Sequence, residues 1–412
     1  MPEVGAVVAG QGELSLRRLG VAPHRLMFFI GASNLLLAMA WWTAWLFAQR
    51  LAWPSMPQPA LPAGWMHATI MQYQMLPSFI FGFLLTVFPR WMGLPELPAW
   101  RYIPVGLGLF GGQFATLLGA LGWDVGLLVG WLMTTAGWLA GLFILGPMLW
   151  REKGTTWHAR SCFLALVLGL AGLLALGVFL FGGSALWAFA SIKLGSFGLL
   201  LPIYVTVAHR MFPFFASGAV PGYVAWRPLW ILAAIWVLAL AHLVLELLHA
   251  YAWLWATDLP LLGLTAMLVW RWWPRGPKPP LLTVLFVALA WLPIAFALYS
   301  AQSVGYLFTG IYGLGRAPAH ALFIGFFGSA LIAMVTRVTQ GHSGRALVLP
   351  PVALFAFVAI QLVTVMRVAA EFAGDGMLWQ SLAALGWLVA FGPWVLRLGR
   401  IYLAPRIDGK AG

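Results

Sequence analysis

The 412-residue sequence has very little cysteine and very little charge. Its single cysteine, Cys162, excludes an internal disulfide and argues against a cysteine-ligated zinc or iron–sulfur site. Charged residues make up only 8% of the chain, whereas a soluble domain carries about 25%. The first 20 residues lack a long apolar stretch before a small-residue cleavage site, so we expect no cleavable signal peptide. The shortage of charge excludes an ordinary soluble globular protein.

Hydrophobic residues, in contrast, make up 62% of the chain and recur in long runs. Runs of roughly 20 apolar residues match the thickness of the hydrocarbon core of a bilayer. The sequence therefore predicts an all-α, polytopic integral membrane protein, with a single membrane domain over residues 1–412 and the lipid bilayer as its surroundings. The twelve predicted spans are 25–47, 66–88, 102–122, 126–149, 162–182, 185–208, 229–250, 252–270, 281–299, 317–336, 349–369 and 377–398.

The basic residues divide unequally between the two sides that twelve spans create. Of the 23 Lys and Arg, nineteen fall on the side of both termini, one lies inside a span, and Arg50, Arg316 and Arg367 fall on the opposite side. Because cytoplasmic loops are rich in Lys and Arg, this split predicts a bacterial inner-membrane protein with both termini in the cytoplasm. Residues 1–24 would form the cytoplasmic N-terminal segment and residues 399–412 the cytoplasmic tail. The net charge of +13 then needs no nucleic-acid partner.

Three spans end alike on the predicted cytoplasmic side. The second, sixth and tenth spans close with Arg90, Arg210 and Arg337, which are 120 and 127 residues apart. Four helices per period would give a pseudo-threefold arrangement of four-helix units. Such an arrangement resembles the large subunit of heme–copper oxidases, in which the second and tenth helices supply axial histidines for a heme. The alternative is that any cytoplasmic helix end tends to carry arginine.

Two histidines, His67 and His320, lie at the outer ends of the second and tenth predicted spans. Neutral imidazole is a common axial ligand of heme, and two such ligands from different helices can clamp the iron inside a bundle. Arg316, four residues before His320, is placed to pair with a heme propionate, because guanidinium binds carboxylates bidentately. The alternative is that both histidines hydrogen-bond lipid headgroups or loops. Three residues at helical spacing are expected to share the face of His67: Met71, Gln74 and Ser78.

A stripe of ionisable residues is predicted in the outer half of the seventh span. His242, Glu246 and His249 are spaced i, i+4 and i+7, which places all three on one face of a helix. Imidazole and carboxylate are suitable ligands for copper, iron or zinc. The same groups also suit a proton or water path, or structural polar contacts inside the bundle. The sequence leaves these three interpretations open.

One cationic side chain within a predicted span, and another at the outer end of a span, need partners. Lys193, in the outer half of the sixth span, requires a counter-ion or a water cavity, and Glu246 on the next span is the candidate. In the eleventh span, Arg367 precedes Glu371 by four residues, which is the spacing of a helical ion pair. The alternative for Arg367 is a contact with a heme propionate.

Basic residues also gather just after two spans on the predicted cytoplasmic side. The stretch TRVTQGHSGR at 336–345 carries Arg337, His342 and Arg345, and HRMFPFF at 209–215 begins with His209 and Arg210. Arginines and backbone amides make anion sites, so phosphate or lipid headgroups are the expected ligands here. Neither stretch is a P-loop, and no nucleotide-binding pattern follows.

Three stretches of the sequence resemble the NnrS family of bacterial membrane proteins. The first is His67-Ala68 through Met71, followed by GFLLTVFPRWMG at 82–93; the second is HRMFPFF at 209–215; the third is AHALFIGFFGSALIAMVTRVTQGHSGR at 319–345. They occur in the family's order over nearly the whole chain, with a compatible number of helices. The resemblance implies a twelve-helix heme protein, with copper also associated with the family, linked to nitric oxide and nitrosative stress.

The family motifs also assign roles to individual residues. By motif position, the resemblance implies that His67 and His320 hold heme, while His342 and Arg345 match the cytoplasmic close of the third stretch. The chain departs from the family in the first stretch, since residues 69 and 70 are threonine and isoleucine where the family has histidine and glutamate, and residue 90 is arginine where it has asparagine. A copper ion that used the family's histidine and glutamate would lack them here.

Residue patterns and resemblance together predict an NnrS-type heme b protein with a bis-histidine heme near the periplasmic side. Because two histidines leave the iron no open position, we expect electron transfer or redox sensing, with nitric oxide as a ligand where one histidine dissociates. A redox partner protein or quinol would supply electrons. If the protein is an enzyme, it is a redox enzyme acting on nitric oxide or a related small molecule. The alternatives are a multi-pass transporter and a non-catalytic electron-transfer or anchor subunit.

Overall fold

The computed structural model describes residues 13–52, 56–152 and 156–409, and every regular element in these ranges is a helix. Twelve helices in the described ranges are long and apolar enough to cross a membrane, which confirms the predicted all-α, twelve-span fold. A short 3-10 helix, η1 (Leu16–Val21), precedes them. In chain order the spans are α1 (Pro23–Arg50); α2 (Ala63–Ile70) with η2 (Met71–Met75) and α3 (Leu76–Trp91); α4 (Ala99–Ala120); α5 (Gly126–Arg151); α6 (Trp157–Leu180); α7 (Ala185–Lys193) with η3 (Leu194–Leu200) and α8 (Leu201–Ala219); α9 (Leu229–Leu247); η4 (Tyr251–Trp253) with α10 (Trp255–Trp272); α11 (Pro280–Thr309); α12 (Ala317–His320) with η5 (Ala321–Gly328) and α13 (Ser329–His342); α14 (Pro351–Ala369); and α15 (Gly376–Leu403).

Two spans run about ten residues further than predicted. The sixth continues to Ala219 rather than 208, and the ninth to Thr309 rather than 299. Polar residues follow both predicted ends, and the helices continue through them. Ser303, for example, is buried and its hydroxyl accepts a hydrogen bond of 2.9 Å from the backbone N–H of Trp255. A polar residue with a partner on a neighbouring helix does not end a span.

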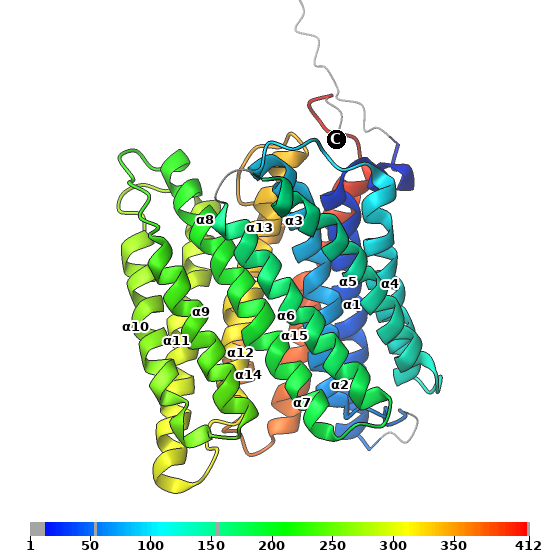
Figure 1. Ribbon diagram of the computed structural model, residues 1–412, viewed down its shortest axis with the longest axis vertical. Helices are drawn as coiled ribbons and strands as arrows, with labels where there is room; N and C mark the ends of the chain where they lie inside the picture. Colours follow the sequence, from blue (N-terminus) through cyan, green and yellow to red (C-terminus); the bar gives the residue numbers. More distant parts are fainter. Residues whose placement is uncertain (1–12, 53–55, 153–155, 410–412) are drawn as a thin grey trace, which may run out of the picture.

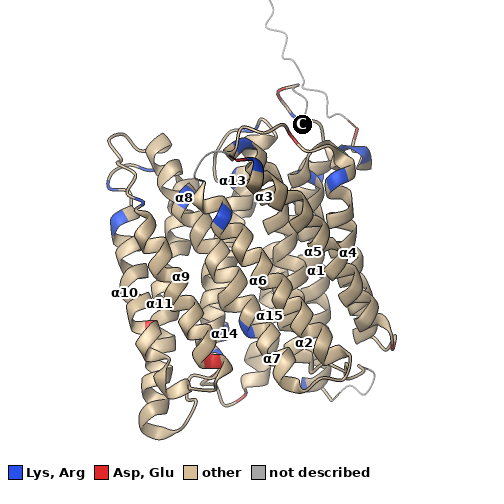
Figure 2. Cartoon of the chain, viewed as in Figure 1, with Lys and Arg blue, Asp and Glu red and all other residues tan. Residues whose placement is uncertain are grey.

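The described chain begins and ends at the same end of the bundle. The backbone N–H of Ser15 donates to the carbonyl of Leu403 at 3.0 Å, and α1 packs against α15, so the first and last spans lie side by side (Figure 1). We call this end the terminal end and the opposite one the far end. Figure 2 shows most Lys and Arg gathered at the terminal end, which is the unequal split that the sequence predicts.

The second, sixth and tenth spans share a departure from regular α-helix. Each contains a π-helical segment, η2, η3 and η5, beginning at residues 71, 194 and 321. These starts are 123 and 127 residues apart, close to the spacing of the three arginines that suggested a repeat. Side chains of all three spans, Phe83, Tyr204 and Phe326 among them, line one apolar cavity of about 70 Å³. The shared π-helices and this convergence support three units of four helices.

Glycine faces glycine where α4 packs against α5. A Cβ at Gly108 would lie 2.5 Å from the Cα of Gly137, and one at Gly126 would lie 2.5 Å from the backbone nitrogen of Gly119. Small residues let the backbones of membrane helices approach closely, and van der Waals contact then holds them together. These glycines therefore set the distance between the two helices.

The substitution Gly108→Ala tests this contact. We expect it to lower the free energy of unfolding by about 1–3 kcal/mol, the usual cost of overpacking, because the new methyl meets backbone atoms rather than a flexible side chain. Gly263→Ala in α10 is the control, since a Cβ there meets nothing within 4 Å. The measurement is thermal unfolding in detergent, and equal stabilities of the two variants would contradict the interpretation.

Candidate cofactor site

A cavity of about 340 Å³ lies among the second, sixth and tenth spans. Its lining includes residues of α2 and α7, which lie toward the far end of the bundle (Figure 1). Its volume falls within the range of about 300–1,000 Å³ that is typical of small-molecule and cofactor sites. His67 and His320 both line this cavity, together with Lys193, Arg316 and Arg367. The structure therefore brings the two predicted heme ligands to one site, although they are separated by about 250 residues of chain.

The imidazole of His67 is held by aromatic stacking. Its ring lies 4.6 Å from the ring of Trp42, nearly parallel to it, and Trp42 in turn stacks on Trp45 at 5.4 Å. Nδ1 of His67 is buried and has no hydrogen-bond partner among the described residues. A buried polar nitrogen is normally paired, so its free state beside a cavity indicates a site for a ligand.

The imidazole of His320 is oriented by its own backbone. Nδ1 lies 2.9 Å from the carbonyl oxygen of Arg316, one helical turn earlier. Because a carbonyl only accepts, Nδ1 carries the proton, and Nε2 keeps its lone pair. A histidine that binds a metal through one ring nitrogen usually donates a hydrogen bond from the N–H of the other, which fixes the tautomer and the ring orientation.

Three cationic side chains stand in the wall of the same cavity. Lys193 pairs with Glu246 at 2.7 Å, and Arg367 pairs with Glu371 at 2.6 Å, so both predicted ion pairs are confirmed. Arg316 is exposed, and its Nη1 lies over Gly64, close to the start of the helix that carries His67. The cavity thus presents two imidazoles and three positive charges, two of which are already paired.

The π-helical segment η2 changes which side chains of the second span face the cavity. Regular helical spacing predicts that Met71, Gln74 and Ser78 share the face of His67, and this is right only for Met71. The extra residue in the π-helical turn rotates the helix beyond it. As a result Gln72 lines the cavity, whereas Gln74 points to Thr116 and Thr134 on α4 and α5. Ser78 lies 3.3 Å from the side-chain nitrogen of Asn34.

The residues that replace the family's histidine and glutamate face away from the cavity. Thr69 lines a separate space of about 30 Å³ with Gln74, and its hydroxyl donates to the carbonyl of Met66 at 3.0 Å. Ile70 is buried among apolar side chains. Copper prefers imidazole, thiolate and thioether ligands over hydroxyls and amides. These residues do not fit a copper ion.

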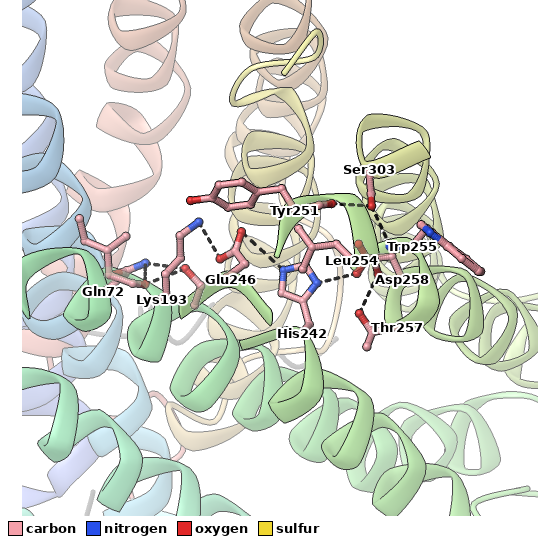
Figure 3. Close-up of polar contacts among 12 residues, drawn as sticks. Gln72, Lys193, His242, Glu246, Tyr251, Leu254, Trp255, Thr257, Asp258 and Ser303 are labelled. Carbon is pink, nitrogen blue, oxygen red and sulfur yellow. Dashed lines mark hydrogen bonds and ion pairs between the residues drawn. The ribbon is translucent and has the colours of Figure 1, made fainter. Parts of the chain in front are cut away.

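A chain of four ionisable side chains begins at the cavity and crosses three spans (Figure 3). Lys193 contacts Glu246; Oε1 of Glu246 lies 3.7 Å from Nε2 of His242; and Nδ1 of His242 lies 2.6 Å from Oδ1 of Asp258. The side chains of Glu246, His242 and Asp258 are at most 1% exposed, while that of Lys193 is 23% exposed. Positive and negative groups alternate along the chain, so each buried charge has an opposite neighbour.

The predicted stripe on the seventh span is wrong at His249. The helix α9 ends at Leu247, and His249 follows it in a left-handed conformation with φ of 56°. Its ring is exposed and lies tilted against the ring of Phe189, 5.2 Å away, instead of joining His242 and Glu246. Within the described ranges, no three or more His, Cys, Asp or Glu side chains form a group that could hold a metal ion. The metal interpretation of this stripe therefore has no support.

Asp258 is the residue that the sequence analysis missed. It lies in the first turn of α10, is fully buried, and pairs with His242 from the preceding span. A local signal exists, since an acidic residue sits inside an otherwise apolar span. The pairing itself depends on how α9 packs against α10, which no pattern within one helix contains.

The basic residues of the terminal end are mostly held by aromatic rings and backbone. Arg210 lies over the ring of Trp91 at 4.3 Å, and Arg337 over that of Phe215 at 4.0 Å. Three further contacts of this group are His209 with His158 at 2.9 Å, the ring of His342 with the tilted ring of His24 at 4.2 Å, and the backbone N–H of Arg345 with the carbonyl of Gln340 at 2.9 Å. Headgroup or phosphate binding at this end stays a prediction.

Twelve apolar spans in the described ranges, with a histidine-lined cavity among some of them, define a multi-pass membrane protein with a cofactor-sized cavity toward one end of its bundle. The model of the family described as NnrS protein matches residues 19–406, nearly the whole chain. The protein therefore belongs to the NnrS family, as its three motifs predict. A search of curated proteins gives no match.

Proposed function

We propose that this NnrS-family protein is a membrane heme b protein in which His67 and His320 are the axial ligands. One observation carries the proposal: imidazoles from the second and tenth spans line a single cavity, where Nδ1 of His67 has no hydrogen-bond partner among the described residues and Nδ1 of His320 is bonded to its own helix, which leaves Nε2 of His320 with its lone pair. Bis-histidine ligation from separate helices is an established way to hold heme in a bundle.

The other residues of the cavity suit the periphery of a heme. Its walls are largely apolar and aromatic, with Met39, Met71, Phe323 and Trp387 among them. Arg316 has a free guanidinium at the cavity, and guanidinium binds carboxylates such as propionates bidentately. Arg367 is a second candidate, although it already contacts Glu371. Heme would supply one-electron redox chemistry here, while the chain's own residues hold its edges and exclude water.

Two axial histidines favour electron transfer or redox sensing over direct gas binding. We therefore place the protein in redox chemistry linked to nitric oxide or nitrosative stress, which is what membership of the NnrS family suggests. Electrons would come from a redox partner protein or a quinol. Nitric oxide would bind only where one histidine is displaced.

We further propose that the terminal end faces the cytoplasm of a bacterial inner membrane. The concentration of Lys and Arg at that end supports this orientation (Figure 2). The cofactor cavity, which lies toward the far end, would then open near the periplasmic side.

The visible spectrum of the purified protein tests the proposal. We expect sharp α and β bands on reduction, because both axial positions of the iron are filled by imidazole. Nitric oxide should then shift the spectrum of the reduced protein slowly, since a histidine must leave first. A preparation that stays colourless after expression with added heme precursor would contradict the proposal and favour a transporter.

A further inference from the structure

We propose that Lys193, Glu246, His242 and Asp258 form a proton-transfer chain that takes up a proton from the cofactor cavity and holds it on buried groups. The inference deepens the proposed function, because it rests on a redox-active group in that cavity. Its subject is a different set of residues, which neither the family motifs nor the heme ligands include.

The repeat of the fold places Lys193 at the head of this chain. Lys193 directly precedes η3, just as His320 directly precedes η5, and His67 lies four residues before η2. All three side chains line the same cavity. In the second and tenth spans the corresponding residue, before the π-helical segment, is a histidine, whose imidazole suits iron. In the sixth span it is Lys193, whose amine binds protons instead. The remaining unit of the repeat therefore supplies the cavity with a proton-binding group.

The contacts behind Lys193 connect it to buried groups on two further spans. Its Nζ lies 2.7 Å from Oε2 of Glu246, and it also lies over the ring of Phe189 at 5.2 Å. Figure 3 shows Lys193 pointing to Glu246, Glu246 to His242, and His242 to Asp258. The four groups come from α7, α9 and α10 and end at a fully buried carboxylate. Lys193 alone is open to the cavity, so exchange with the cavity takes place there.

The hydrogen bonding of the chain is incomplete in a way that suits proton movement. Nε2 of His242 and Oδ2 of Asp258 are buried and have no hydrogen-bond partner among the described residues. Burying ions within a membrane is costly, and a purely structural network would be expected to satisfy every member. Imidazole with a carboxylate at each ring nitrogen can take a proton on one side and release one on the other. The gap of 3.7 Å to Glu246 closes with a small side-chain movement or one water.

The net charge of the four groups explains why their protonation would respond to an electron added in the cavity. With His242 neutral, one lysine and two carboxylates sum to −1; with His242 protonated, the sum is zero. An electron delivered to the cavity by a one-electron donor adds a negative charge nearby, which favours the protonated state. Uptake of one proton then balances one electron.

The transfer begins with His242 neutral and its Nδ1–H directed to Asp258. Lys193 gives a proton to Glu246, and Glu246 passes a proton to the free Nε2 of His242. Lys193 then takes up a proton from the cavity, to which it is open. Lys193 and Glu246 end as they began, His242 ends protonated, and the chain has gained one proton.

The other titratable groups around the chain do not compete for this proton. Tyr299 from α11 packs edge-on against His242 at 5.4 Å, and its phenol is neutral at pH 7, because phenols titrate near pH 10. In the loop before α12, burial and the carboxylates of Glu246 and Asp258 raise the pKa of Tyr312, so it too is neutral. His249 is exposed just after the end of α9, where its ring contacts that of Phe189, and among the described residues its side chain makes no hydrogen bond or ion pair with the four side chains of the proton-transfer chain.

An infrared titration tests the chain without any cofactor. Purified protein is titrated between pH 5 and 9 while carboxylate and protonated carboxyl bands are recorded. We expect a pH-dependent carboxyl signal that Asp258→Asn removes and His249→Asn leaves unchanged. Asparagine is isosteric with aspartate, so this variant keeps the packing. If no signal depends on pH, or if Asp258→Asn leaves it intact, the chain holds no exchangeable proton and the proposal is overturned.

A redox titration of the heme-loaded protein tests the coupling. The midpoint potential should fall as pH rises, with a slope that approaches one proton per electron, a tenfold change per pH unit or about 59 mV. His242→Asn and Asp258→Asn should each flatten this slope, while His249→Asn retains it. A slope that is unchanged in both chain variants would overturn the coupling. Absence of heme bands would instead contradict the proposed function and the coupling with it, and the infrared titration would still decide whether the chain carries a proton.

Discussion

Replacing His320 with alanine is expected to remove most of the bound heme. Changes to groups that merely orient a metal ligand already cost about 10–100-fold in metal affinity, so loss of a direct ligand should cost at least as much. His67→Ala should have a similar effect, with a residual five-coordinate spectrum if one ligand still holds the iron. The measurement is the ratio of heme absorbance to protein in preparations purified side by side.

The control for both variants is His249→Ala. This histidine also lies at the far end but is exposed, and its Nδ1 lies 3.2 Å from the backbone carbonyl of Leu247. It should keep full heme content and normal α and β bands. Full occupancy in both His67→Ala and His320→Ala would mean that the heme lies elsewhere or is not bound by these imidazoles.

Nitric oxide binding by His67→Ala, faster than in the unaltered protein, would indicate that this histidine normally blocks the iron.

Asp258→Ala is expected to lower the free energy of unfolding by about 3–5 kcal/mol, the cost of breaking a buried ion pair by removing one partner. The change leaves Nδ1 of His242 facing an apolar gap in a fully buried position. His242 would then lose its proton or draw water into the bundle. Thermal unfolding in detergent, compared with the unaltered protein, measures the loss.

A double variant separates the ion pair from its surroundings. Replacing both partners, His242→Phe with Asp258→Leu, should recover much of the stability, because two apolar groups leave no unpaired charge. Asp124→Ala provides a matched control, since Asp124 is exposed at the same end of the bundle and its loss should change stability little. If Asp258→Ala proves as stable as Asp124→Ala, the contact between His242 and Asp258 contributes little to the fold.

The number of spans and the clustering of basic residues at one end follow from local properties of the sequence. Hydropathy is a property of one segment at a time, and a run of about 20 apolar residues has few alternatives to a membrane helix. Successive loops between spans lie on alternate sides of the membrane, so the number of basic residues on each side follows from the order of the spans and does not depend on how the helices pack. For the same reason the ion pair of Arg367 and Glu371 was predictable, since the partners are four residues apart in sequence, at the end of α14.

The heme ligands were predictable only as candidates. Residue type and depth singled out His67 and His320, and the family motifs pointed to the same two residues. That both line one cavity depends on the packing of the second span against the tenth. The π-helical segments could not be anticipated either, because the sequences of η2 and η5 suit an ordinary helix equally well. The rotation that η2 causes exchanged Gln74 for Gln72 at the cavity wall.

Helix identity, helix number and charge distribution are thus readable from the chain, because each depends on residues close together in sequence. The sequence does not reveal one cluster of contacts, that of Lys193, Glu246, His242 and Asp258. These contacts depend on the packing of three spans and on where α9 ends. A helix that stops at Leu247 sends His249 outward and leaves Glu246 as the last acidic group within it. Packing between helices selected the partners, since burial in a membrane makes an unpaired charge too costly to leave alone.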